Sequence, residues 1–422
     1  MNKYSISFLS FLILSCSNST DYSLSEDQTN DPSSSRIISM PKMEEGDADI
    51  QLAANNIYTI ILDNLRNNKD DAQLPDFFGG GYTDNTGNLF VMIKGDFHIG
   101  SQIIKNIVND PIIKIIPCNY SLQELTDIIK TISSKIKSAP IEIQQNISVF
   151  YLADSANKVF VGLENADTTH IHDFENYIIK HDAIEFIDIK TKNQIRYNPL
   201  KTMIAPIFLN PGSLVSNTRF PIHQYVGSWA FRVRDKYDSL SIGMVTAAHL
   251  PLDSVFFGGY YVGMCTLPIF TDEVDASLVE MGSTNFHYFP VPTNTLATEY
   301  VNGPYPSHNE EVELDTATNL PIAGTIINKR GWTTGLTTGV VISSNYCATF
   351  WLTNGQMRVI NNMTSSSYVA EDGDSGGIVY TYYSSLNKRY TTGIHLGTIP
   401  STRTTIFTKA KLALQALGVE RY

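Results

Sequence analysis

Five consecutive residues near the C-terminal end, 373–377 (GDSGG), have the composition of a catalytic serine loop. A serine hydroxyl is a poor nucleophile, so it needs a base beside it and hydrogen-bond donors for the oxyanion that it creates. Flanking glycines leave room for a substrate and let backbone N–H groups point inward. We therefore expect Ser375 to attack, with the N–H groups of Gly373 and Ser375 forming the oxyanion hole. A plain Gly/Ser/Asp turn is the alternative.

The order of acids and histidines along the chain decides which type of serine site is possible. The loop also satisfies Gly-x-Ser-x-Gly, the nucleophile elbow of α/β-hydrolases, in which the acid and then the histidine follow the serine. No aspartate follows Ser375, and the only glutamate, Glu420, comes after the only downstream histidine, His395. The elbow is therefore excluded, and the other members of a triad must lie upstream, in the order His…Asp…Ser.

A base and an acid in that order are present. Residues 243–249 (GMVTAAH) form an apolar, strand-like run that ends at His249, which suits a base presented at the end of a strand. Asp275 leads into the sequence ASLV, which would enter a core, as expected of a buried carboxylate that orients the imidazole. Asp272, in a polar Thr-Asp-Glu sequence, is the alternative acid.

These motifs resemble those of a known family. Residues 246–249, 275–279 and 373–377 are similar to the triad motifs of chymotrypsin-fold serine proteases, and their spacings suit that fold. The resemblance implies an all-β protease domain of two six-stranded barrels over residues 211–422, with the triad in the cleft between them. It also implies an endopeptidase that cleaves polypeptides through an acyl-enzyme and needs no cofactor or metal.

Residues 330–335 (RGWTTG) resemble the Arg-Gly-x-Thr-Thr-Gly stretch of the streptogrisin and α-lytic branch of that family. In that branch an arginine pairs with the aspartate before the nucleophile, a role that the match gives to Arg330 and Asp374. The branch usually carries one cysteine directly after the catalytic histidine and another four residues before the serine. Here these positions hold Leu250 and Glu371, so two of the family's disulfides are absent.

The resemblance also implies the residues of the substrate pocket, which are Val369, Ala370, His395, Leu396 and Thr398. Val369 stands where trypsin-like enzymes have an aspartate, so a preference for basic residues is not supported. The sequence GIH that ends at His395 resembles the Gly-x-His of glutamyl endopeptidases, whose histidine binds an acidic side chain. Two acidic residues just before the serine loop would repel such a side chain, so a histidine packed for structural reasons is the alternative.

The N-terminal end reads as an export signal. Residues 1–16 contain Lys3, an apolar run too short to span a bilayer, and a lipobox-like ILSC sequence that ends at Cys16. Lipidation of Cys16 would make the protein a cell-envelope lipoprotein, and an ordinary signal peptide would make it secreted. Residues 17–46 are rich in Ser, Asn and Asp and are expected to form a flexible tether.

Residues 47–190 are predicted to form an α+β domain. Apolar residues recur at helical spacing over 50–65, and Ser121 with Glu124 makes a capping box for a second helix. The domain is completed by four further predicted elements: a strand over 89–93, a hairpin that turns near Asn157, a short helix around 173–180 and a strand over 184–189. The sequences FGGGYTD (78–84) and SANKVFV (155–161) resemble the pro-region of α-lytic-type precursors.

That second resemblance implies that the N-terminal domain assists folding of the protease and inhibits it until it is removed. The proline-containing residues 191–210 are then the junction where the precursor is cut. A separate binding domain is the alternative. On that reading the protein is a protease-fold binding or adhesion lipoprotein whose cleft stays blocked.

The amino-acid composition limits the kinds of molecule that the protein is expected to bind. The 422 residues carry a net charge of −12 with 17% charged and 42% hydrophobic residues, which argues against a nucleic-acid partner and against membrane contact other than through a lipid anchor. The pair His170 and His172 lacks a third ligand and is expected to lie in a solvated loop. Cys118, Cys265 and Cys347 are expected either to form one disulfide in some pairing or to stay reduced.

Overall fold

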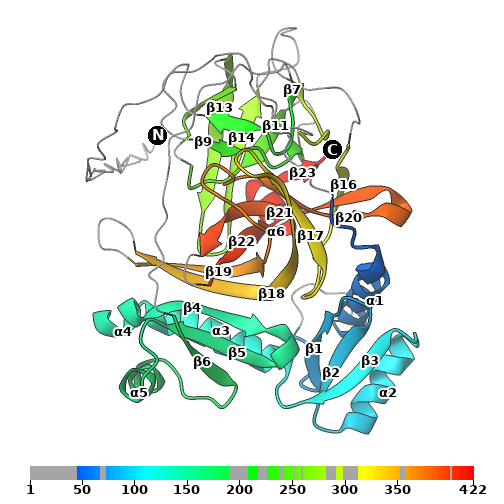
Figure 1. The fold of residues 1–422 in the computed structure, drawn as a ribbon, viewed down its shortest axis with the longest axis vertical. Helices are drawn as coiled ribbons and strands as arrows, with labels where there is room; N and C mark the ends of the chain where they lie inside the picture. The colour runs from blue at the N-terminus through cyan, green and yellow to red at the C-terminus, as the bar shows by residue number, and fades with distance from the viewer. Residues whose placement is uncertain are drawn as a thin grey trace, which may run out of the picture.

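The computed structural model describes residues 45–66, 73–189, 208–216, 226–237, 241–250, 252–257, 260–281, 291–297, 312–351, 357–399 and 402–422. The predicted signal segment with Cys16, nearly all of the tether and most of the junction lie outside these ranges. Within them, no helix has the length and apolar character needed to cross a membrane. In Figure 1, an α+β part that begins with α1 lies below a β-rich part.

The α+β part consists of two lobes with the same order of elements, a β-hairpin followed by a helix and a parallel third strand. The first lobe contains α1 (Asp49–Leu65), β1 (Phe78–Thr83), β2 (Leu89–Lys94), α2 (Phe97–Ile107) and β3 (Ile113–Cys118). The second contains α3 (Leu122–Ile136), α4 (Ile141–Asn146), β4 (Ile147–Ala153), η1 (Asp154–Ala156), β5 (Lys158–Leu163), α5 (Thr168–Tyr177) and β6 (Ile184–Asp188). In each lobe the helix crosses over between two parallel strands, as such a connection requires.

Local sequence signals account for most of these elements. Ser121 accepts the backbone N–H of Glu124, and the Glu124 carboxylate accepts that of Ser121, which confirms the predicted capping box of α3. Asn157 adopts a left-handed φ of 52° and closes the predicted hairpin between β4 and β5. The helix expected around 173–180 is wrong in position, because Asp167 caps α5 through the N–H of His170 and starts the helix earlier.

The β-rich part contains two large sheets. The first has the order β23-β10-β11-β14-β13-β12-β8-β9. Its strands are β8 (Leu214–Ser216), β9 (Val226–Ser228), β10 (Arg232–Asp235), β11 (Ile242–Thr246), β12 (Ser254–Phe257), β13 (Tyr260–Phe270), β14 (Asp275–Met281) and β23 (Val419–Arg421). Two short strands, β7 (Phe208–Leu209) and β15 (Val291–Pro292), form a separate parallel pair. In the sequence, β7 comes just before β8 and β15 comes after β14.

The second sheet closes on itself through six strands, because β17 pairs with both β18 and β20. The strands are β17 (Ile326–Gly331), β18 (Gly335–Trp351), β19 (Met357–Ser366), β20 (Ile378–Tyr383), β21 (Lys388–Ile399) and β22 (Thr404–Lys409), and β16 (Asp315–Thr318) adds to β21. The turn η2 (Ser384–Leu386) joins β20 to β21, and α6 (Ala410–Leu417) leads from β22 to β23. The predicted β-rich arrangement of two sheets after an α+β part is confirmed. The first sheet has eight strands along its described path, and the second closes as a six-stranded barrel.

The α+β part and the second barrel share one sheet. Strand β4 pairs antiparallel with β18, with Tyr151 opposite Tyr346 and Val149 opposite Ala348, so the barrel sheet continues into β5 and β6. The rings of Tyr151 and Tyr346 stack with centroids 5.0 Å apart. Buried residues of both parts form common apolar clusters; one cluster joins Val149 with Ile360, Met363 and Leu396 among others. Such an interface has the character of a divided core.

A buried carboxylate lies at this interface. Asp154, at the end of β4, accepts the N–H of Ser344 (3.1 Å) and its hydroxyl (2.8 Å) from β18. Burial raises the pKa of Asp154 to about 6, and the hydrogen bonds from Ser344 and the charge of Lys409 only partly oppose this shift. Burial, followed by the charge of Asp154, raises the pKa of Tyr58 on α1.

We expect Asp154 to make the stability of the chain increase on mild acidification. Its pKa in the folded chain, about 6, exceeds its ordinary 3.8, so the folded state binds the proton more tightly. The free energy of unfolding of the wild type, relative to that of an Asp154→Asn variant, should rise by ~2 kcal/mol as pH falls from about 7 to about 4. Urea titrations of both proteins at the two pH values measure this difference. A difference that is constant with pH, or that falls on acidification, would contradict the assignment.

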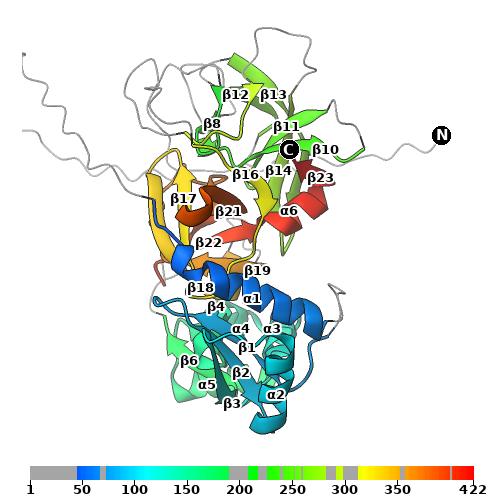
Figure 2. The same ribbon diagram turned by 90° about the vertical axis from the view of Figure 1, so that its right-hand side faces the viewer.

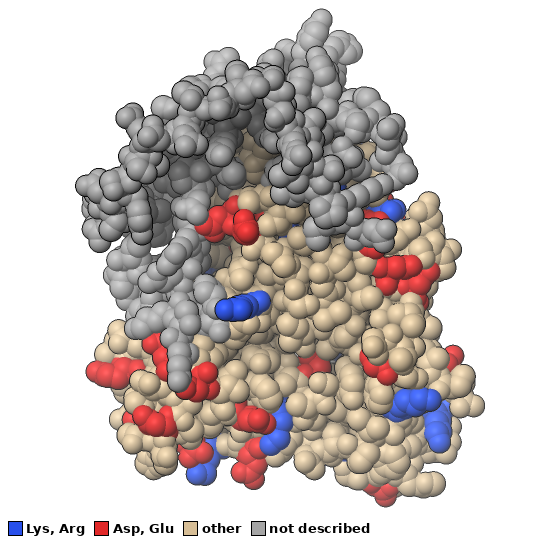
Figure 3. Space-filling model, in the orientation of Figure 1, with Lys and Arg blue, Asp and Glu red and all other residues tan. Residues whose placement is uncertain are grey.

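The surface of the described residues carries mixed charge. On the face shown in Figure 3, acidic and basic side chains lie interspersed over the lower part of the molecule, and much of the area above it is uncharged. Ion pairs among the described residues include Lys94–Asp76 (3.2 Å) and Lys180–Glu175 (2.9 Å). Exposed pairs of this kind contribute about 1 kcal/mol or less to stability.

Candidate active site

Strands of the first sheet bring His249 and Asp275 together. His249 follows the end of β11, and Asp275 is the first residue of β14, which pairs with β11 in the sheet. The His249 Nδ1 and Asp275 Oδ2 atoms lie 2.5 Å apart, and both side chains are almost fully buried. The other carboxylate oxygen accepts the backbone N–H groups of Ala248 (2.7 Å) and His249 (2.9 Å). Asp275 therefore fixes both the ring and the backbone of the histidine.

Asp272 has a different environment. Its Oδ2 atom pairs at 2.5 Å with Lys137, the residue that follows α3, and its side chain is 40% exposed. Its backbone carbonyl accepts the N–H of Asn361. The alternative acid therefore faces the α+β part and solvent, whereas Asp275 faces the imidazole.

The loop that carries Ser375 connects β19 to β20 and packs against the end of β11. Gly376 has a left-handed φ of 85°, and a Cβ atom there would lie 2.2 Å from the Thr246 Oγ1 atom and 3.0 Å from the Ala247 nitrogen. Only glycine allows this approach. The Thr246 hydroxyl donates to the Ser228 carbonyl, and the Ser228 N–H donates to the Ser375 carbonyl (2.7 Å). The serine loop is thus attached to the strand that presents His249.

The hydroxyl of Ser375 has a specific partner in this structure. It donates to the backbone carbonyl of Leu396 on β21, at 3.2 Å. The neighbouring peptide groups tie the loop to the same strand, because the N–H of Gly376 donates to the His395 carbonyl and that of His395 to the Gly377 carbonyl, both at 2.8 Å. The serine oxygen is therefore held toward β21 in the chain with its α+β part attached.

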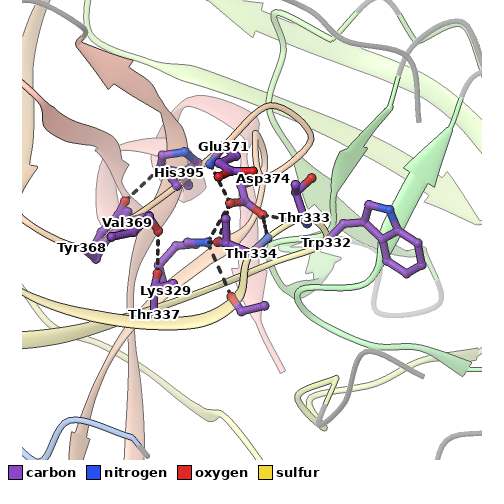
Figure 4. A network of polar contacts seen from close by, with 12 residues as sticks. Lys329, Trp332, Thr333, Thr334, Thr337, Tyr368, Val369, Glu371, Asp374 and His395 are labelled. Atoms are coloured by element: carbon purple, nitrogen blue, oxygen red, sulfur yellow. Dashed lines mark hydrogen bonds and ion pairs between the residues drawn. The ribbon is translucent and has the colours of Figure 1, made fainter. Parts of the chain in front are cut away.

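Asp374 is the centre of a buried polar network, shown in Figure 4. Its side chain is fully buried and lies 2.8 Å from the Lys329 Nζ atom. The hydroxyl of Thr334 (2.7 Å) and the backbone N–H groups of Thr333, Thr334 and Glu371 (2.8–3.0 Å) also donate to it. Burial by itself would raise the pKa of Asp374, but the charge and hydrogen bonds of Lys329 outweigh it and hold the pKa below its ordinary value.

This network corrects one prediction from the sequence. The cation that pairs with Asp374 is Lys329, whereas the sequence motif assigned that role to Arg330. Both residues lie on β17, and consecutive side chains leave a strand on opposite faces, so only one of them can face the serine loop. The arginine side chain instead lies over Gly212, where a Cβ atom would be 2.6 Å from its Cγ. No signal in the sequence separates these two adjacent cations, because the direction in which each one points follows from the pairing of β17 with β20.

Ser228 is a second residue that the sequence did not point to. Its hydroxyl donates to the Gly373 carbonyl (2.8 Å) and accepts the N–H of Trp332 (2.8 Å), and it is fully buried. Gly373 has a φ of 96°, which favours glycine. Ser228 thereby links the first sheet to both the serine loop and the turn after β17. The Trp332 ring points from that turn toward the first sheet in Figure 4 and packs on its core.

The residues assigned to the substrate pocket lie on two neighbouring segments, one just before the serine loop and the other on β21. Val369 is 61% exposed, and the Thr398 hydroxyl on β21 reaches the Ala370 carbonyl at 3.4 Å. Leu396 is buried in the apolar cluster that includes residues of the α+β part. His395 is buried as well, and its Nδ1 atom lies 2.9 Å from the Tyr368 hydroxyl. Burial, followed by the charge of Lys329, lowers the pKa of His395 to about 3, so the ring is neutral.

Cysteines and candidate metal ligands lie outside this site. Cys118, Cys265 and Cys347 are free thiols. Within the described ranges, no group of three or more His, Cys, Asp or Glu residues has the arrangement of a metal site. His170 and His172 lie on α5, where they contact Asp167 and Asn176, respectively.

The α+β part is similar to two described domain families. Residues 42–118 match the family model for a Pro-like N-terminal domain, and residues 123–189 match that for a Pro-like C-terminal domain. These two matches correspond to the two lobes seen in the structure. The chain joins two lobes that match Pro-like models to a β-rich part of two large sheets.

Solved structures similar to the chain are bacterial proteases of low sequence identity. Protease A of Thermobifida fusca is 21% identical with a TM-score of 0.37, and 50% of this chain and 97% of that chain are covered. The Nocardiopsis protease NAPase is 21% identical with a TM-score of 0.38, with 50% and 98% covered. A glutamic acid-specific serine protease, which uses a histidine triad in substrate binding, is 22% identical with a TM-score of 0.37, with 50% and 99% covered. No curated protein matches the sequence.

Proposed function

We propose that this chain is a serine endopeptidase made as a proenzyme, with His249, Asp275 and Ser375 as its catalytic triad. The observation that carries the proposal is the buried His249–Asp275 pair beside a loop that contains Ser375 and packs on the same strand. A buried carboxylate bonded to Nδ1 holds the proton on that nitrogen, so Nε2 is the nitrogen that acts as the base. Serine acyl transfer requires a base that is oriented in this way.

In the proposed reaction, His249 Nε2 takes the proton of the Ser375 hydroxyl as the oxygen attacks the carbonyl carbon of a peptide bond. The oxyanion is stabilised by the N–H groups of Gly373 and Ser375, and Asp275 stabilises the imidazolium. The imidazolium then gives its proton to the leaving amine, which yields an acyl-enzyme. Water attacks the ester with His249 again as base, and the acid product leaves.

In this structure the Ser375 hydroxyl donates to the Leu396 carbonyl, so attack requires that hydrogen bond to break. The Asp374 network, by contrast, is already formed while the Pro-like region is attached. Activation would therefore depend on uncovering the cleft rather than on assembling the loop.

The Pro-like region is proposed to inhibit the protease domain until the chain is cut between them, near residues 191–210. The shared sheet and shared apolar clusters support this role. We further propose export, with anchoring by a lipid on Cys16. The carboxylate-binding role of His395 would have to use a neutral ring as a hydrogen-bond donor, because its pKa of about 3 excludes a positive charge in this state.

A second candidate is a binding or adhesion lipoprotein whose cleft is permanently covered. The continuous β4–β18 sheet favours it, because the Pro-like region buries surface that a protease would need to release. The two functions differ in whether Ser375 can become reactive.

Labelling with a fluorophosphonate tests the proposal. After limited proteolysis within 190–211 and separation of the Pro-like fragment, we expect the probe to modify Ser375 in the wild type and not in a His249→Ala variant, as found by mass spectrometry of the labelled peptide. N-terminal sequencing of the separated protease fragment identifies the bond that was cut. Absence of labelling once the Pro-like fragment has been removed would reject the enzyme in favour of the binding protein.

A further inference from the structure

The segment that precedes α1 is bound by the chymotrypsin-like domain as a peptide ligand would be. The carboxylate of Glu45 receives three hydrogen bonds of 2.6–3.0 Å from the guanidinium of Arg389, and a further one of 2.6 Å from the Tyr380 hydroxyl. The side chains of Glu45 and Arg389 are only 16% and 11% exposed. A fork-to-fork pair of this geometry is among the stronger polar contacts in proteins.

The next residue, Gly46, is bound through its backbone N–H and carbonyl groups. The side-chain amide of Asn328 on β17 accepts the N–H of Gly46 and donates to its carbonyl, both at 2.8 Å. A Cβ atom at Gly46 would lie 2.1 Å from the Thr338 methyl group and 2.8 Å from that of Ile326. The site therefore accepts a glycine after the glutamate and excludes a larger residue.

Three further residues continue the contact along β20. Asp47 forms a parallel bridge with Tyr382, and the Ala48 N–H donates to the Tyr382 carbonyl (2.8 Å). The Asp49 carboxylate accepts the Ser385 N–H (2.6 Å) and hydroxyl (2.8 Å) at the turn η2. Residues 45–49 thus lie along β20, with one β-bridge at Asp47 and side-chain contacts on either side of it.

This contact is separate from the shared sheet. The β4–β18 pairing comes from the second lobe of the Pro-like region, whereas residues 45–49 belong to the first lobe and contact β17, β20 and η2. Figure 2 shows the segment that leads into α1 running up beside β17, above β4. Two linked contacts must open together before a bound partner can leave, so each slows dissociation of the whole.

We propose that residues 45–49 form a latch that keeps the Pro-like region bound to the chymotrypsin-like domain after the junction between them is cut. This inference rests on the proposed role of that region in the proenzyme. The latch site, made by Asn328, Tyr380 and Arg389 with η2, recognises an acidic segment that begins Glu-Gly-Asp. Cleavage of the junction alone then leaves a two-fragment complex, and release requires the latch to open as well.

The test measures release of the Pro-like fragment after a defined cut. A recognition sequence for an external protease is inserted between residues 190 and 207 in a Ser375→Ala background, and the cut protein is followed by size-exclusion chromatography and surface plasmon resonance. Glu45→Gln should increase the dissociation rate about 30-fold, since it removes the charge that pairs with a nearly buried guanidinium. Arg389→Gln should act similarly, and the double variant should dissociate no faster than either single one.

Two further variants complete the design. Asp76→Asn breaks a surface pair with Lys94 within the Pro-like region, where Asp76 is 82% exposed, and should leave the rate unchanged within twofold. Asp49→Ala removes the hydrogen bonds to Ser385 at the exposed end of the latch. This variant replaces the Glu45 variant in the release measurement if the latter does not fold. It should increase the rate about threefold.

Dissociation of the Glu45→Gln and Arg389→Gln proteins at the wild-type rate would overturn the proposal, as would independent, additive effects of the two. Because the nucleophile is absent and no activity is measured, this result is independent of the fluorophosphonate labelling. Failure of the latch therefore leaves the proposed enzyme intact, and absence of enzyme activity leaves the release rates interpretable.

Discussion

Replacing Asp275 by asparagine is expected to lower the rate of peptide hydrolysis by the processed protein about 10⁴-fold while the fold is retained. The Oδ1 atom would still accept the N–H groups of Ala248 and His249. The amide NH₂ would then face Nδ1 and force that nitrogen to accept a hydrogen bond. The ring proton would move to Nε2, which could no longer take the proton from Ser375.

The measurement is kcat/KM on a peptide substrate after removal of the Pro-like region, with far- and near-UV circular dichroism to confirm the fold. Asp272→Asn is the matched control, because this carboxylate pairs with Lys137 of the Pro-like region and not with the imidazole. It should change kcat/KM less than about threefold. If Asp275→Asn retains more than about a tenth of the activity, or if Asp272→Asn abolishes it, the assignment of the acid is wrong.

Lys329→Met is expected to have the largest effect on stability, about 3–5 kcal/mol. Methionine matches the length of the lysine stem, so the main change is that the fully buried Asp374 carboxylate loses its only ion-pair partner among the described residues. The hydrogen bonds from Thr333, Thr334 and Glu371 remain but carry no full positive charge. Denaturant unfolding of the two proteins measures the difference. Lys388→Met, which breaks an exposed pair with Asp315, should cost about 1 kcal/mol or less.

The pH dependence of this variant has a definite sign. In the wild type the pKa of Asp374 lies below its ordinary value, so the stability it contributes is present above that value and is lost as pH falls further. Without Lys329, burial dominates and raises the pKa of Asp374, so the variant should lose stability as pH rises. The gap between the two proteins should therefore be widest at neutral pH and narrow on acidification. An equal gap at both pH values would show that the pair does not act through charge.

Residue types and their order along the chain determined much of the candidate site. Chain order excluded an α/β-hydrolase, because neither an aspartate nor a suitably placed glutamate follows Ser375. A strand that ends at His249 and a carboxylate at the start of an apolar run were sufficient to select His249 and Asp275, which the structure brings within 2.5 Å of each other. Caps and turns are equally local, so the helix α3 and the hairpin at Asn157 could be predicted from a few neighbouring residues.

The direction in which each side chain points, and the contacts between residues far apart in the sequence, were decided only by the tertiary structure. Lys329 and Arg330 are adjacent cations, and no local rule states which of them points to Asp374 until the register of β17 is known. The Ser375 hydroxyl meets the Leu396 carbonyl, and Glu45 meets Arg389, across 21 and 344 residues of chain, respectively. Local propensities act over a few residues, whereas such contacts arise when whole sheets pack. The sequence therefore identified the candidate catalytic residues but not the residues that contact them across the fold.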